Sequence, residues 1–176
     1  MKNLKAKDEV IQFSLKDYLG NAVNLSDYKG KKVFLTFLRG ASCPFCSMRM
    51  RDLINKHSNF KANGIEVIVF YASSKELITK YAGKQDPPFS VIPDPNLEMY
   101  TKYGVEQSKS GMTRAMMQPL KMMKVMFSGF FNMKASKDRP IIPADFLIDE
   151  NQTIFKVYYG EDFGDHLPVD EILNWK

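Results

Sequence analysis

Cysteine and histidine are both scarce in this sequence, which holds two of each among 176 residues. Structural zinc sites need four ligands, and the positions of His57 and His166 fit no compact zinc finger around Cys43 and Cys46, so zinc is disfavoured. We predict no metal and no other cofactor. No apolar run reaches the ~18 residues of a membrane span, and no apolar stretch follows the first lysines as in a signal peptide. We therefore expect a cytoplasmic protein without stable membrane insertion.

Acidic residues are scarce in one part of the chain. The whole chain carries a net charge of +5, and residues 107–139 hold seven Lys or Arg against one Asp, so this segment is +6 and the remainder −1. A basic patch attracts anionic partners. This one lacks a dense basic run interleaved with aromatic residues, so we predict no nucleic-acid partner and interpret the charge as a solvated helix face.

The hydrophobic pattern predicts an α/β protein with a mixed sheet, in one domain spanning residues 1–176. The stretch "KKVFLTFL" is nearly continuous in apolar residues, which is typical of a central strand buried on both faces. Strands are expected at residues 10–15, 31–38, 65–73, 89–96, 143–149 and 153–160, with a hairpin turn within 17–28 and helices at 44–64, 75–83, 97–105 and about 169–175.

The two cysteines form the motif "CPFC". Cys43 falls between a predicted strand and the helix that Pro44 opens, where free N–H groups and the helix dipole stabilise a thiolate. Arg39 adds a positive charge nearby, and Cys46 lies one turn later, where it can form a disulfide with an oxidised Cys43. A reducing cytosol disfavours a permanent disulfide. The motif therefore predicts a redox-active dithiol, with a pair of inert buried cysteines as the alternative.

The succession of strand, "CPFC" and helix, followed later by "IPADFLID", resembles the thioredoxin fold. In that fold a proline before a late strand packs beside the active-site cysteines through a cis peptide bond, and Pro143 occupies that place. The resemblance implies a cis bond between Ile142 and Pro143. A trans proline that opens an edge strand is the alternative.

Three further stretches resemble the peroxiredoxin-like branch, the alkyl hydroperoxide reductase and thiol-specific antioxidant type. They are "FSLKDYLGNAVNLSDYKGKKVFLTFLRG", "PDPNLEMYTKYGV" and "PADFLIDENQTIFKVYYG", which resemble the branch's opening hairpin and central strand, its Asp-Pro turn and helix, and its late hairpin. The resemblance implies a thioredoxin-like fold: a central mixed β-sheet flanked by helices, an N-terminal β-hairpin and a Met-rich helical insertion at about residues 107–139.

The same resemblance implies a thiol peroxidase. Cys43 would attack hydrogen peroxide or an organic hydroperoxide as a thiolate, and Cys46 would resolve the sulfenic acid by forming a disulfide. An external thiol reductant of the thioredoxin or glutathione type would then restore the pair.

The family's usual peroxide clamp is missing. That clamp is Pro-x-x-x-Thr/Ser-x-x-Cys with a distant Arg, and Thr36, Gly40 and Pro143 stand at its proline, hydroxyl and Arg positions. Our hypothesis is that Arg39, Ser42 or Thr36 replaces it, since a guanidinium can polarise the O–O bond as the leaving oxygen gains charge.

Two alternative functions remain open. The motif "CPFC" also resembles the glutaredoxin active site, and Pro143 resembles thioredoxin's proline, so a thiol–disulfide oxidoreductase acting on a small disulfide is the second hypothesis. Thioredoxin moves protons with a buried carboxylate before its cysteines, and here Asp145 would serve only if its side chain points towards them. The third hypothesis is a non-enzymatic redox-sensing dithiol.

Seven of the eleven methionines lie within residues 111–134. The apolar stripe predicted there recurs at helical spacing and consists of Met116, Leu120, Met123, Phe127 and Phe130. We interpret this helix as a cap on the core or as the contact of a homodimer. Alternative hypotheses are an adaptable wall over the active site, for a lipid-like peroxide or a partner protein, and a basic helix resting on an anionic membrane. The two histidines receive no functional role.

Overall fold

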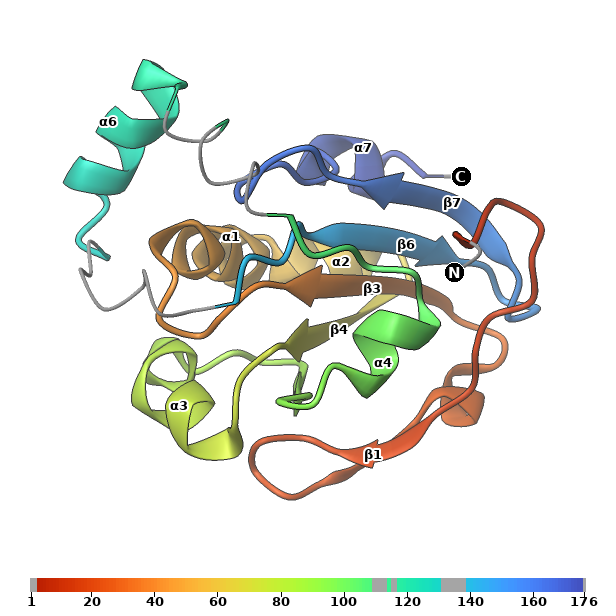
Figure 1. Cartoon of the computed structure of the whole chain (residues 1–176). Helices are drawn as coiled ribbons and strands as arrows, with labels where there is room; N and C mark the ends of the chain where they lie inside the picture. The colour runs from red at the N-terminus through yellow and green to blue at the C-terminus, as the bar shows by residue number, and fades with distance from the viewer. Residues whose placement is uncertain (1–2, 109–113, 115–116, 131–138, 176) are drawn as a thin grey trace.

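The computed structural model describes residues 3–108, 114, 117–130 and 139–175. Its centre is a five-stranded sheet in the order β5-β4-β3-β6-β7 (Figure 1). β3 is parallel to β4 and β4 to β5, whereas β6 is antiparallel to β3 and to β7, which confirms the predicted mixed sheet. The strands are β3 (Lys32–Leu38), β4 (Ile65–Tyr71), β5 (Ser90–Pro93), β6 (Ala144–Ile148) and β7 (Ile154–Tyr159).

Helices and a short hairpin surround this sheet. The hairpin pairs β1 (Ser14–Lys16) with β2 (Ala22–Asn24), so the strand predicted from residue 10 begins later than expected. The α-helices are α1 (Pro44–Asn55), α2 (His57–Ala62), α3 (Lys75–Lys80), α4 (Glu98–Lys102), α6 (Pro119–Phe127) and α7 (Val169–Leu173), and 3₁₀ helices cover Leu25–Tyr28 and Ala82–Gln85.

The single helix predicted over residues 44–64 is wrong, because the structure has two helices there. The backbone leaves helical geometry at Lys56, with φ −101° and ψ 7°. After this break, Phe60 of α2 stacks on Phe34 of β3 with ring centroids 6.2 Å apart. The second helix therefore continues the apolar layer over the sheet in a new direction.

β3 is buried on both faces, as its apolar run predicts. On one face the Phe37 ring stacks on Phe70 at 4.9 Å between centroids and meets Tyr100 of α4 edge-on at 5.0 Å. On the other face Leu38 belongs to the apolar cluster that includes Met50 of α1. Burial of large apolar side chains on both faces holds this strand in the middle of the molecule. Its carboxyl end leads directly into the turn before α1.

The helix of the Met-rich segment lies at one corner of the molecule, beside α1 in Figure 1. Leu120, Met123 and Phe127 are all exposed, so the interpretation of this stripe as a cap on the core is wrong. Of the other stripe residues, Met116 lies outside the described residues.

The bond between Ile142 and Pro143 is trans, because no peptide bond in the described part of the chain is cis. The cis bond that the thioredoxin resemblance implies is therefore wrong. The Ile142 N–H donates to the Glu106 carbonyl at 3.1 Å, and the Pro143 carbonyl accepts from the Gly160 N–H at 2.9 Å. These bonds tie the segment that leads into β6 to neighbours on both sides. Phe37 pairs with the next residue, Ala144, so Pro143 lies at the carboxyl end of β3.

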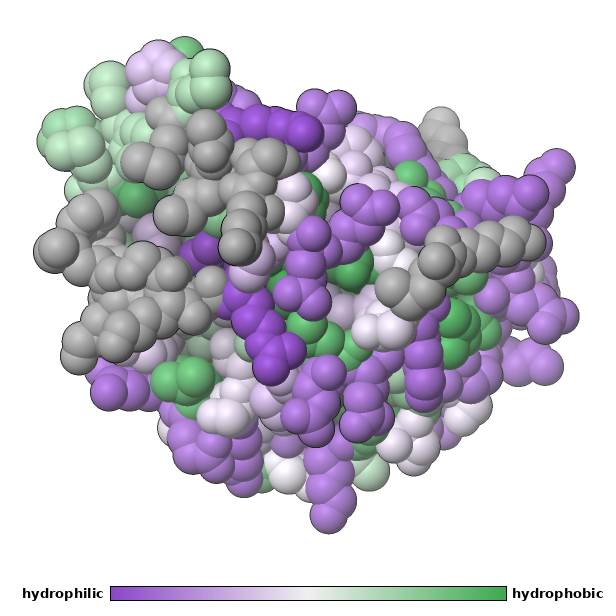
Figure 2. All heavy atoms as spheres, viewed as in Figure 1, coloured by the Kyte–Doolittle hydropathy of each residue, from purple (hydrophilic) through white to green (hydrophobic). Residues whose placement is uncertain are grey.

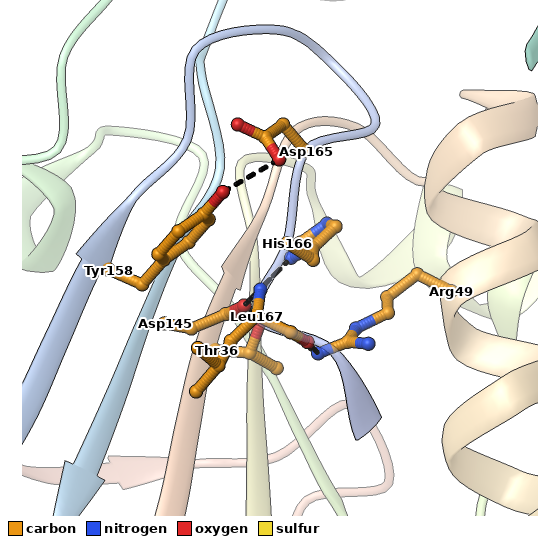
Figure 3. A network of polar contacts seen from close by, with 7 residues as sticks. All are labelled: Thr36, Arg49, Asp145, Tyr158, Asp165, His166 and Leu167. Carbon is orange, nitrogen blue, oxygen red and sulfur yellow. Dashed lines mark hydrogen bonds and ion pairs between the residues drawn. The ribbon is translucent and has the colours of Figure 1, made fainter. Parts of the chain in front are cut away.

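A buried carboxylate joins the sheet to α1 (Figure 3). Asp145 on β6 pairs with Thr36 on β3, whose hydroxyl donates to Oδ1 at 2.5 Å. The Leu167 N–H donates to Oδ2 at 2.7 Å, and His166 Nδ1 lies 3.2 Å from both carboxylate oxygens. Arg49 of α1 lies 3.6 Å from Oδ2 and donates to the Leu167 carbonyl at 2.9 Å. We call these five residues the Asp145 network.

The Asp145 network keeps its carboxylate ionised. Burial by itself raises the pKa of this group, but charge attraction and hydrogen bonding from His166, the charge of Arg49 and the Thr36 hydrogen bond outweigh burial, so the pKa of Asp145 lies below its usual value. Burial lowers the pKa of Arg49, and Asp145 counteracts that effect. The network thereby fixes α1 and the 160–168 loop, which connects β7 to α7, against the sheet.

Replacing Asp145→Asn should lower the free energy of unfolding by about 3–5 kcal/mol at pH 7, because Arg49 loses its buried counter-charge. Folding lowers the pKa of Asp145, so its contribution is present above the unfolded carboxyl pKa of about 3.9 and is lost as the pH falls through the folded value. The difference between wild type and variant should thus be present at about pH 5 and shrink below about pH 4. Urea unfolding at a series of pH values measures it.

The exposed Glu150→Gln variant is the matched control, expected to change stability by less than about 0.5 kcal/mol. An Asp145→Asn protein as stable as wild type at pH 7 would contradict the role given to this charge.

Candidate active site

The cysteines lie where β3 turns into α1. The Cys43 N–H donates to the Gly40 carbonyl at 3.1 Å, and the Ala41 N–H donates to Ser73 Oγ at 3.0 Å. Cys43 is the N-cap residue of α1, and Pro44 takes the first turn of the helix, as its position after Cys43 predicts. The positive end of the α1 dipole therefore lies at Cys43, where it favours a thiolate.

Both thiols are free and shielded from solvent: Cys43 is 0% exposed and Cys46 is 1% exposed. Burial raises the pKa of the Cys46 thiol well above its usual value, and its hydrogen bond with Cys43 raises it further. The charge of Arg39 and the backbone N–H of Gly40 act in the opposite direction. Cys46 is therefore a protonated thiol at neutral pH, and a protonated thiol can donate a hydrogen bond to a thiolate at Cys43.

Arg39 brings a buried positive charge to this pair. Its side chain is 4% exposed, and its guanidinium carbon lies 4.3 Å from the centroid of the Phe163 ring. Contact with an aromatic face stabilises a guanidinium group and fixes its plane. Phe163 belongs to the 160–168 loop, so this loop positions the charge that acts on Cys46.

The 160–168 loop packs against the start of α1. The Asp165 carboxylate accepts from the Tyr158 hydroxyl and from a loop N–H, both at 2.8 Å. Burial and then Asp165 raise the pKa of Tyr158 to about 12, so this hydroxyl remains a donor. Gly164 lies so close to Phe45 that a Cβ atom there would be 2.8 Å from the ring. A larger residue at position 164 would therefore displace the Phe45 ring or the loop.

A cavity of about 260 Å³ opens beside Phe45, between α1, the 160–168 loop and α6. Met48, Lys124 and His166 contribute to its lining. The His166 side chain is 6% exposed, and its Nε2 atom is buried with no hydrogen-bond partner among the described residues. Nδ1 faces Asp145. Among the described residues, the lining of this cavity includes Phe45 but not Arg39, Cys43 or Cys46, so the cavity lies beside the thiol site.

The predicted site residues do not all come together. The structure brings Arg39, Cys43 and Cys46 into one cluster. Pro143 lies at the same end of the sheet but lines another cavity, of about 180 Å³, with Glu106 and other residues.

One residue was assigned wrongly, and others had no predicted role. Thr36 was a hypothetical part of a replacement peroxide clamp, but its hydroxyl donates to Asp145, so that hypothesis is wrong. Phe163, Arg49 and His166 stand in no motif of the sequence. Only the basic character of Arg49, one turn after Cys46 on a predicted helix, hinted at a contact near the cysteines.

The part of the chain that the structure describes contains no group of three or more His, Cys, Asp or Glu side chains placed to hold a metal ion. Within the same residues, no helix combines the length and apolar character needed to cross a bilayer.

Comparison with known proteins assigns the chain to a family. The sequence profile of the AhpC/TSA family matches residues 6–157. Peroxiredoxin Bcp of Escherichia coli strain K12 is 27% identical over 175 residues, which cover 99% of this chain and 97% of that protein. The thiol-disulfide oxidoreductase ResA of Halalkalibacterium halodurans is 28% identical over 102 residues, 57% of each chain.

Solved structures with a similar fold have names of the same two kinds, a peroxiredoxin type and a thiol–disulfide exchange type. The crystal structure of peroxidoxin BcpB from Mycobacterium tuberculosis superimposes with a TM-score of 0.71 and 18% identity, covering 97% of this chain and 95% of that one. A thiol:disulfide interchange protein DsbE from Chlorobium tepidum gives a TM-score of 0.58 at 20% identity, covering 89% and 86%. With a family profile that spans most of its length, the chain belongs to the AhpC/TSA family and is a peroxiredoxin-like oxidoreductase.

Proposed function

We propose that this protein reduces hydroperoxides through Cys43. The observation that carries the proposal is the placement of Cys43 at the N-terminus of α1, beside the buried Arg39 and a Cys46 thiol that burial keeps protonated. Peroxiredoxin relatives of nearly the same length support this reaction type.

The first step is attack of the Cys43 thiolate on one peroxide oxygen. The S–O bond forms as the O–O bond breaks, and Cys43 becomes a sulfenic acid. The leaving hydroxide or alkoxide takes up a proton and departs as water or alcohol. Arg39 stabilises the negative charge that develops on this leaving oxygen, in place of the missing family clamp.

The second step resolves the sulfenic acid. The Cys46 sulfur attacks the Cys43 sulfur, an S–S bond forms, and the hydroxyl group leaves with the Cys46 proton as water. The hydrogen bond between the two thiols supports this step, since it requires the two side chains to be close together. An external thiol of the thioredoxin or glutathione type then reduces the disulfide by exchange. A reducing thiol pool suits this cycle, so we place it in the cytoplasm.

Substrate access requires a local opening. Cys43 is 0% exposed, so a peroxide reaches its sulfur only after the 160–168 loop or the start of α1 has moved. The contacts that must loosen include those of Phe163 with Arg39 and of Gly164 with Phe45. Loops that close over reactive groups commonly act in this way.

A thiol–disulfide oxidoreductase is the second candidate, which the likeness to ResA and DsbE favours. The Asp145 contacts argue against a thioredoxin-like version of that reaction. Asp145 is occupied by Thr36, Leu167 and His166, and its pKa is lowered, so it does not exchange protons near neutral pH. A homodimer through the Met-rich helix stays a prediction.

Removal of the Cys43 sulfur nucleophile should abolish peroxide reduction. Stopped-flow experiments measure how fast reduced protein consumes hydrogen peroxide and tert-butyl hydroperoxide. Wild type should consume both peroxides rapidly, and Cys43→Ser should consume them no faster than buffer alone. Cys46→Ser should keep the first, single-turnover phase but lose steady-state turnover, because no disulfide forms.

Wild-type consumption no faster than that of a free small thiol would contradict the peroxidase. Reduction of insulin disulfides by the same sample would then support the second candidate, and oxidation without turnover would support a redox sensor.

Arg39→Ala should slow peroxide consumption by about 10²-fold, since it removes the charge that stabilises the leaving oxygen. Arg39→Lys keeps a positive charge and should recover part of the rate, which a purely structural role would not explain. The single-turnover rate measures both variants, and thermal unfolding checks that each is folded. Equal rates for wild type and Arg39→Ala would remove Arg39 from the mechanism.

A further inference from the structure

α6 exposes its apolar side instead of burying it. Four side chains form what we call the α6 stripe: Leu120 is 74% exposed, Met123 53%, Met126 64% and Phe127 83%. At 3.6 residues per turn these positions fall within an arc of about 120°. Val125, 1% exposed, points to the opposite side, towards the body of the protein. Most surface helices of globular proteins bury such an arc in the core.

The stripe is also visible on the molecular surface. Figure 2 shows mainly hydrophobic atoms over the corner where Figure 1 places α6, whereas most of the rest of that face is hydrophilic or neutral. A clustered apolar surface of this kind marks an interaction site more often than scattered apolar residues do.

The sequence around the stripe is basic. Residues 107–137 contain six Lys or Arg and no Asp or Glu. Lys124 is exposed and lies one turn from Leu120, at the edge of the stripe. The surface that α6 presents is therefore apolar in the middle and basic at its margin.

A second copy of the chain is a poor partner for this surface. Two stripes packed together would bring the exposed Lys124 of each copy into proximity, and like charges repel. The stripe also holds only Leu, Met and Phe, so it offers no hydrogen bond that would specify the register of a protein partner. Flexible Met side chains adapt to irregular apolar surroundings.

We propose that α6 binds the surface of anionic phospholipid membranes. The α6 stripe enters the boundary between headgroups and acyl chains, and Lys124 lies among the phosphate groups. A short amphipathic helix with basic margins lies in the membrane plane in this way and depends on anionic lipid.

The position of α6 connects this contact to the cysteines. Arg51 of α1 donates to the Ser128 carbonyl at 3.2 Å, and its guanidinium carbon lies 4.9 Å from the Phe130 ring centroid. Lys124 and Phe45 line the same 260 Å³ cavity. Membrane-bound α6 thus places the start of α1 near the lipid, which makes lipid hydroperoxides the substrate class. This second step rests on the proposed function.

Vesicle flotation tests the membrane contact without any enzymatic reaction. Wild-type protein should float with vesicles of phosphatidylcholine and phosphatidylglycerol, much less with phosphatidylcholine alone, and less as NaCl is raised. The double variant Met123→Glu/Phe127→Glu should bind anionic vesicles at least about tenfold more weakly, because it places charge in the stripe. Leu19→Glu is the matched control: Leu19 is 65% exposed in the β1–β2 turn, and this variant should bind like wild type.

Absence of flotation with anionic vesicles, or equal flotation of the double variant, overturns the proposal. A wild-type dimer without lipid that the double variant converts to a monomer also overturns it, and supports the homodimer. If a column of immobilised acidic protein retains wild type but not the double variant, and neither binds vesicles, the membrane proposal is overturned and a protein partner is supported.

The substrate class has its own measurement. Wild type should reduce phosphatidylcholine hydroperoxide in anionic vesicles faster than the double variant, while both consume tert-butyl hydroperoxide in solution at the same rate. Equal rates on the vesicle substrate would refute the lipid substrate class alone. Inactivity of wild type on both peroxides would refute the proposed function and leave the flotation result standing.

Discussion

The ionised carboxylate of Asp145 is the interaction on which the arrangement of the site depends. A charge buried in the core must be paired and hydrogen-bonded, since leaving it unpaired costs several kcal/mol. Its partners come from different elements: Thr36 from β3, Arg49 from α1, and His166 and Leu167 from the 160–168 loop. Apolar side chains of the same helix and loop, among them Met50 and Leu167, also pack in the core. The buried charge adds directional contacts to this packing and ties the helix and the loop to the sheet.

The position of the 160–168 loop also determines the surroundings of the two thiols. With the loop fixed, Phe163 packs on Arg39 and Gly164 packs against Phe45, and the pair of cysteines is enclosed. Enclosure has two opposed effects. It keeps the Cys46 thiol protonated and close to its partner, and it also excludes the substrate. The catalytic cycle that we propose would therefore alternate between a closed state that arranges the sulfurs and an open state that admits peroxide. The apolar stripe on α6 lies beside the same helix, where a membrane contact would act on substrate supply without touching the sulfurs.

Features with local causes were predictable from the sequence, and those that depend on distant pairings were not. The apolar run of β3 predicted a buried central strand, and the order of residues around Cys43 predicted the start of a helix. Which side chain meets Thr36 depends on the register of β3 with β6, 109 residues away, so its bond to Asp145 could not be foreseen. His166 gained its contact in the same way, from a loop with no recognisable motif. The trans bond before Pro143 shows the limit of a resemblance, because a proline in a matching sequence position does not by itself determine the peptide isomer.

The identity of the oxidised product tests the central claim, that Cys43 reacts and Cys46 resolves, most directly. Reduced protein is treated with one equivalent of hydrogen peroxide, quenched with an alkylating reagent, digested and measured by mass spectrometry. We expect loss of two hydrogen atoms from the intact chain and a peptide in which Cys43 and Cys46 are joined by a disulfide. In the Cys46→Ser variant we expect a sulfenic or sulfinic acid on Cys43. Oxidation confined to Cys46, or two alkylated thiols after the peroxide has been consumed, would contradict the central claim.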